Sequence, residues 1–309
     1  MRRAFIDTLC EMAAADERIV LLTGDLGYML LERFRDRFPG RFINVGVAEQ
    51  NMIAVATGLA EAGLLPYAYS IATFAALRPF EFIRNGPVFH RLPVRIVGVG
   101  AGFGYGAAGA THHGVEDIAA LRTLPGLTIV VPADSRQAST AIRCTANHPG
   151  PIYYSLGKDE KEPIHGLEGR FELGRVEWVR RGNDLAIVAM GSIVSEAVIA
   201  AEELSSRGLE ASVLVVSNFH PDPTEDLVRL LVDFPRVVGI EAQAISGGLC
   251  AFLGTLIASH SLQCRFTPLA VCRPQDGKSG SERDCWRRNG IDAREIIEAL
   301  AIRTERAGR

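Results

Sequence analysis

Short, almost continuously apolar runs recur along this chain, and they constrain its fold more than any other feature. Residues 94–99, 127–131 and 184–190 read VRIVGV, LTIVV and DLAIVAM. Strands that are apolar on both faces are typical of parallel sheets covered by helices on both sides. Amphipathic segments separate the runs, as the crossover connections of a parallel sheet require. The pattern therefore predicts an α/β protein with doubly wound, mostly parallel sheets.

Two series of such units follow one another, and 309 residues suit two domains. A charged segment with Pro and Gly, residues 157–169, separates the series and is the predicted linker. We predict domains over residues 1–165 and 170–309. The expected strands are 18–23, 41–45, 94–99, 127–131, 151–156, 184–190, 211–216 and 237–240, and the expected helices are 48–62, 195–207, 224–234, 248–259 and 291–301.

Composition argues against several classes of protein. The net charge is −3, whereas binding to duplex nucleic acid usually needs a basic surplus. No apolar run reaches the roughly 18 residues of a membrane span, and Asp7 and Glu11 interrupt any signal-peptide pattern. Six widely spaced cysteines without a CxxC pair indicate reduced thiols and a cytoplasmic location. We expect neither nucleic acid nor a membrane as a partner.

Glu49 is the first candidate for chemistry. It stands in GVAEQNM, residues 46–52, just after a predicted strand and in the first turn of a predicted helix. One interpretation is a favourable contact between an acidic side chain and the helix dipole. The other is a carboxylic acid at the carboxyl edge of a sheet, in an apolar setting that raises its pKa. Such an acid exchanges a proton with a ring nitrogen of a ligand.

Aromatic residues gather in the next segment, residues 70–84, which contains Phe74, Phe80 and Phe82. Their spacing is compatible with an ordinary core cluster. It is also compatible with a platform on which a planar heterocycle stacks.

Glycines are dense from residue 98 onward and lead into THHGVED at 111–117. GYGAAG at 104–109 matches the dinucleotide pattern G-x-G-x-x-G, but no helical pattern begins at its third glycine. We predict instead a loop whose glycines let the backbone pass close to a ligand and present His112 and His113. Adjacent histidines lack the spacing of a metal pair, so a polar contact or proton carrier is favoured.

These segments, in this order, resemble the transketolase family, whose members use thiamine diphosphate. GVAEQNM resembles the family's glutamate motif, TFAALRPFEFIRN its aromatic segment, and GATHHGVEDIAALRTLPGLTIVVPAD the run that contains its Thr-His pair. The resemblance covers nearly the whole chain, but only the carboxyl-terminal half of a full-length transketolase. It implies a pyrimidine-binding domain followed by the transketolase carboxyl-terminal domain.

The resemblance also implies roles for single residues. Glu49 would contact N1′ of the aminopyrimidine and so promote loss of the thiazolium C2 proton. Phe74 would stack on the pyrimidine, with Phe80 as a second aromatic, and His112 would act at the substrate. The remaining candidates are Asp25 for the cofactor and His113 and Lys158 for the substrate.

Two departures from the family pattern affect the predicted function. The family holds Mg²⁺ and the diphosphate with a GDG motif followed by an Asn, whereas residues 24–27 read GDLG. We therefore predict a split transketolase, such as an α₂β₂ assembly, whose N-terminal-half partner carries the GDG…N motif and binds Mg²⁺. Gly100 and Ala108 occupy positions where the family often has side chains that bind a phosphorylated ketose donor. This favours a specialised two-carbon transfer between sugars or sugar phosphates.

Two alternatives remain open. One is a 2-oxoacid-decarboxylating subunit, like the β chain of a dehydrogenase E1 or a deoxyxylulose-phosphate synthase. The other is a nucleotide-binding or scaffolding subunit without catalytic function.

Overall fold

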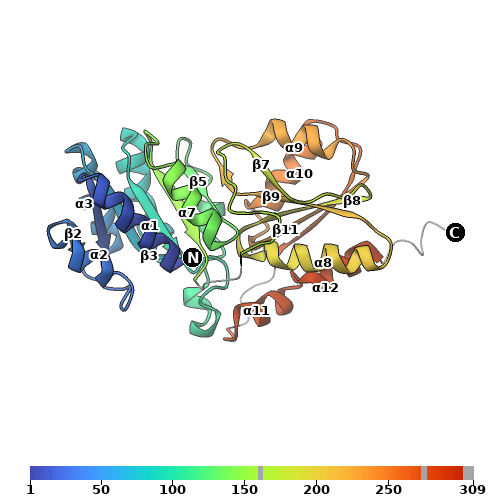
Figure 1. The fold of residues 1–309 in the computed structure, drawn as a ribbon, viewed down its shortest axis with the longest axis horizontal. Coiled ribbons are helices and arrows are strands. Elements are labelled where there is room, and N and C mark those ends of the chain that lie inside the picture. Colours follow the sequence, from blue (N-terminus) through green and yellow to red (C-terminus); the bar gives the residue numbers. More distant parts are fainter. Residues whose placement is uncertain (159–162, 273–276, 302–309) are drawn as a thin grey trace.

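The computed structural model describes residues 1–158, 163–272 and 277–301. Two α/β halves lie side by side, the first blue to green and the second yellow to red (Figure 1). This arrangement confirms the predicted α/β class with two mostly parallel sheets. Part of the predicted linker, residues 159–162, lies outside the described residues.

The first sheet has the strand order β10-β5-β6-β4-β3-β1-β2, and all neighbours are parallel except β10 and β5. The chain passes from β1 to β2 on one side and then returns to β3 on the other side of β1. This reversal makes a topological switch point between β1 and β3. The strands are β1 (Ile19–Thr23), β2 (Phe42–Asn44), β3 (Leu65–Ile71), β4 (Arg95–Val99), β5 (Thr128–Val130), β6 (Ile152–Leu156) and β10 (Asn218–Phe219).

Helices cover both faces of this sheet, as its continuously buried strands require. Apolar side chains of α1 (Arg2–Ala15), α2 (Glu32–Arg37) and α7 (Ser135–Cys144) join one core cluster. A second core cluster contains apolar side chains of the helices on the other face. These helices are α3 (Glu49–Glu61), α4 (Ala72–Ala76), α5 (Phe80–Ile83) and α6 (Asp117–Leu121).

The second sheet has the order β12-β11-β8-β9-β7, with only β7 antiparallel to its neighbour. Helices α8 and α12 lie on one side of it and α9 and α10 on the other (Figure 1). The elements are β7 (Val176–Arg180), β8 (Leu185–Met190), α8 (Val194–Ser206), β9 (Ala211–Val216), α9 (Thr224–Leu231), β11 (Arg236–Ala244), α10 (Leu249–Ser259), β12 (Arg265–Val271), α11 (Glu282–Asn289) and α12 (Ala293–Ala301).

Every expected strand and helix forms within a few residues of its predicted bounds. The structure adds elements that the pattern did not predict, of which β3 matters most because it lies between β1 and β4. Pro66 is its second residue, and proline usually argues against a central strand. The described residues contain no helix long and apolar enough to cross a membrane.

The two halves are joined by a shared strand pairing and a shared core. Strand β10 comes from the second half but pairs antiparallel with β5 of the first, with Phe219 opposite Ile129. One apolar cluster contains Ile129 and Val131 together with Leu214 and Val216. Core packing therefore continues across the boundary between the halves.

Arg122, just after α6, ties the first half to the second. Its guanidinium donates hydrogen bonds to the carbonyls of Gly247 and Gly248, at 2.6 and 2.9 Å. The same group stands over the Phe219 ring, 4.3 Å from its centroid. Charge-assisted hydrogen bonds and stacking on an aromatic face both contribute to stability.

We expect Arg122→Ala to lower the free energy of unfolding by about 2–3 kcal/mol, because two carbonyls lose a charged donor. Urea denaturation measures this change. The control is Arg207→Ala, which removes an exposed ion pair with Glu203 at the C-terminal end of α8 and should cost less than about 1 kcal/mol. Equal losses in the two variants would contradict a linking role for Arg122.

Candidate active site

Loops that follow parallel strands all leave the same edge of the sheet, where ligands of doubly wound folds bind. The loops after β1, β2, β3, β4 and β6 carry the segments singled out in the sequence. The fold thus brings together residues that lie more than 100 positions apart.

Glu49 begins α3 and is 2% exposed. Ser70 at the end of β3 donates a hydrogen bond to its Oε1 at 3.2 Å. Nη1 of Arg78 lies 2.9 Å from Oε2 and 3.1 Å from Oε1, which makes an ion pair. Gly24 faces the same carboxylate, since a Cβ there would lie 3.7 Å from Oε1. The expectation of an apolar setting is wrong, because a guanidinium and a hydroxyl contact the carboxylate.

Phe74 in α4 connects this carboxylate to the histidine loop. The guanidinium carbon of Arg78 stands 3.8 Å from the centroid of the Phe74 ring. On another side the ring meets His112, with centroids 5.2 Å apart at an interplanar angle of 65°. Nδ1 of His112 lies 3.0 Å from the Thr111 hydroxyl.

The contacts continue through Tyr105 to Lys158. The rings of Tyr105 and His112 are 6.3 Å apart, and Nζ of Lys158 is 4.9 Å from the Tyr105 ring centroid. Gly100 permits this packing, because its φ is +75° and a Cβ would collide with the Tyr105 ring. We call this contiguous set the candidate row; its members are Glu49, Arg78, Phe74, His112, Tyr105 and Lys158.

The other predicted site residues lie outside this row. His113 is 4% exposed and meets the ring of Phe103 edge-on, so the adjacent histidines face different surroundings. Phe80 packs against the apolar core. Asp25 is exposed after β1, where hydrogen bonds from Asn44 and Tyr28 lower its pKa. Residues 104–109 form a loop with a short 3₁₀ turn and no α-helix, which confirms the prediction there.

Arg78, Ser70 and Tyr105 had no predicted role, although they stand in the segments singled out. A signal for Arg78 was present in the sequence. It follows Phe74 by four residues, a spacing that places two side chains on one face of a helical turn.

Asp117 anchors the end of the glycine-rich loop. It is fully buried and accepts hydrogen bonds from the Tyr153 and Ser155 hydroxyls of β6, at 2.7 and 2.8 Å. Its other oxygen accepts from the amide of Ile118 at 2.8 Å. Burial raises the pKa of Asp117 to about 6, against the lowering effect of these three hydrogen bonds.

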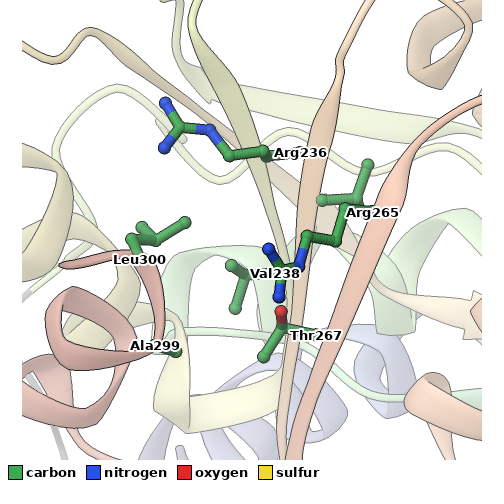
Figure 2. Close-up of a pocket in the computed structure, with 7 residues that line it drawn as sticks. Arg236, Val238, Arg265, Thr267, Ala299 and Leu300 are labelled. Atoms are coloured by element: carbon green, nitrogen blue, oxygen red, sulfur yellow. The ribbon is translucent and has the colours of Figure 1, made fainter. Parts of the chain in front are cut away.

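A small, partly open pocket lies among β11, β12 and α12 (Figure 2). It has a volume of about 90 Å³, and its lining includes Arg236 and Arg265. These arginines are register partners at the amino ends of β11 and β12, whereas the first half contacts the carboxyl end of β11 through Ala244. Within the described part of the chain, no group of three or more His, Cys, Asp or Glu side chains is placed to hold a metal ion.

Comparison with known proteins agrees with this fold. The chain matches the transketolase pyrimidine binding domain over residues 1–161 and the transketolase C-terminal domain over residues 174–296. These two domains define a class of enzymes that depend on thiamine diphosphate. The chain belongs to the transketolase family.

Several relatives are similar over nearly their whole length. The chain is 35% identical over 308 residues to a 6-deoxy-6-sulfo-D-fructose transketolase subunit of Clostridium sp. (strain MSTE9), covering 99% of this chain and 95% of that protein. It is 31% identical over 299 residues to one of the apulose-4-phosphate transketolase subunits of Phocaeicola vulgatus, covering 96% and 95%. A solved split gene transketolase, described as an inactive β4 tetramer, superimposes with a TM-score of 0.88 at 31% identity, covering 97% and 96%.

We expect Asp117→Asn to remove a pH dependence of stability. Because the folded pKa of about 6 exceeds the ordinary value of 3.8, the folded state binds this proton more tightly. The contribution of Asp117 to the free energy of unfolding is greatest below pH 3.8. It falls, by at most about 3 kcal/mol, as the pH rises to 6. Urea denaturation at pH values from 4 to 7 measures it.

The matched control is Asp233→Asn, at an exposed carboxyl, which should keep the wild-type pH profile. Parallel profiles for the wild type and Asp117→Asn would show that Asp117 does not titrate as described.

Proposed function

We propose that this chain is the pyrimidine-domain subunit of a split transketolase that transfers a two-carbon ketol unit from a ketose donor to an aldose acceptor. The observation that carries the proposal is the buried carboxylate of Glu49. It lies beside the switch point of a parallel sheet and is linked through Arg78 to the face of an aromatic ring. A buried carboxylate together with an aromatic face suits a planar heterocycle with a ring nitrogen.

The row fits the pyrimidine half of thiamine diphosphate. When bound, this cofactor supplies a nucleophilic carbon that accepts the ketol unit. Glu49 would hold a proton at the pyrimidine nitrogen, and its burial keeps bulk water from that proton. Phe74 would provide the stacking face, and Phe80 would support it from the core.

The far end of the row suits the substrate. His112 has a polar partner in Thr111 and stands between the rings of Phe74 and Tyr105. It would bind a hydroxyl or carry a proton there. Lys158 adds a positive charge beyond Tyr105, which suits an anionic sugar. The names of two relatives, which refer to a sulfo-sugar and a sugar phosphate, agree with an anionic substrate.

Exposed apolar side chains around the site support a partner polypeptide. Met29 is 97% exposed and Val47 is 72% exposed, and Tyr28 and Leu77 are also exposed. They stand on the loops that carry Asp25, Glu49 and the Phe74 segment. Clustered exposed apolar residues mark interaction surfaces. The partner proposed here is a GDG…N polypeptide that binds Mg²⁺ and the diphosphate, with α₂β₂ as the assembly.

We expect Glu49→Gln to lower turnover of the assembled enzyme by about 100- to 10,000-fold, because an amide cannot relay a proton. Steady-state kinetics with a ketose donor measures the loss. The control is Glu61→Gln at the exposed end of the same helix, which should leave turnover unchanged. Unchanged turnover in Glu49→Gln would instead favour the scaffolding alternative.

We also expect the isolated chain to show no turnover with thiamine diphosphate and Mg²⁺, and a GDG…N partner to restore it. The reconstituted enzyme is assayed in parallel with a ketose donor and with pyruvate. Product from the ketose supports the proposal, and product only from pyruvate would favour a decarboxylating enzyme. Turnover by the chain alone would contradict the split site.

A further inference from the structure

Arg78 contacts both groups that the proposed function assigns to the cofactor's pyrimidine. Its guanidinium stands over Phe74, with the carbon 3.8 Å from the ring centroid. Its Nη1 lies within 3.1 Å of both carboxylate oxygens of Glu49. The side chain thus makes one stacking contact and one charged hydrogen-bonding contact at the same time.

A guanidinium is flat, stacks on aromatic rings and donates in its own plane. An aminopyrimidine is also flat, stacks and can share a proton with a carboxylate. Two flat groups cannot occupy the same face of Phe74 and the same side of Glu49. Binding of one therefore requires departure of the other.

The burial of Glu49 explains why its carboxylate benefits from a charged partner. A carboxylate that is 2% exposed is costly unless it is paired and hydrogen-bonded. Ser70 provides one neutral donor, and Arg78 provides the charge. Without Arg78, the carboxylate would keep only Ser70, the weaker of these two partners.

Arg78 is also free to leave. Its side chain is 41% exposed, although it contacts a buried carboxylate. It belongs to the segment just after α4, and its long flexible stem can turn into solvent by rotamer changes alone. Departure therefore requires no movement of the sheet.

We infer that Arg78 is a stand-in for the cofactor: it pairs with Glu49 and covers Phe74 in the cofactor-free chain, and the entering pyrimidine displaces it. The displacement rests on the proposed function, whereas the pairing of Arg78 with Glu49 does not. The tests separate these two parts.

The pairing is tested by thermal unfolding of the isolated chain. Arg78→Met should lower the Tm by several degrees, because Glu49 loses its charged partner. Adding Glu49→Gln to Arg78→Met should recover part of that loss, since the amide removes the buried charge. The control is Arg84→Met, at an exposed arginine that hydrogen-bonds Asn85, which should leave the Tm unchanged. Purely additive effects would overturn the pairing.

The displacement is tested by calorimetric titration of the assembled complex with thiamine diphosphate and Mg²⁺. Arg78→Met should bind about 10-fold more tightly than the wild type, and Arg84→Met should match the wild type. Arg78→Lys, which keeps the charge but not the flat group, should also bind more tightly and covers the case in which Arg78→Met fails to assemble.

Equal or weaker binding by both Arg78 variants, with normal wild-type binding, would overturn the displacement alone. No binding by any variant, the wild type included, would overturn the proposed function as well.

Discussion

Buried parallel strands can be connected only by crossovers, and this constraint determines where each loop of the first half emerges. The loops after β1, β2, β3, β4 and β6 all leave one edge. The chain reverses direction across the sheet between β1 and β3, so neighbouring loops separate there. Gly24 after β1 and Ser70 at the end of β3 both face Glu49 at this place. The position of the carboxylate thus follows from the strand order.

Three buried carboxylates show how their partners decide what a buried acid can do. Asp117 is bound by two hydroxyls and an amide, all on packed elements. Glu241 on β11 accepts hydrogen bonds from the amides of Leu249 and Cys250 at the start of α10, and burial raises its pKa to about 7. Fixed donors make both acids structural. Glu49 is held mainly by Arg78, a flexible and partly exposed side chain, so its partner can be exchanged for a ligand.

Much of the fold could be predicted because burial leaves a local pattern. Runs such as 94–99 and 184–190 form strands β4 and β8 as expected, and the helix expected at 48–62 forms as α3. Strand β3 was not predicted, since Pro66 and the small residues of LPYAYSI obscure its apolar content. Strand β10 has two residues, too few for any periodicity, and its partner β5 lies in the other half.

The sequence by itself determined the class of fold, the glutamate, aromatic and Thr-His segments, and the loop character of residues 104–109. These properties depend on residue type and short-range spacing. Only the tertiary structure decided that Arg78 pairs with Glu49, that His112 and His113 contact different aromatic rings, and that Tyr105 links His112 to Lys158. Each of these contacts depends on strand order and on side-chain directions across separate loops, which no local pattern records.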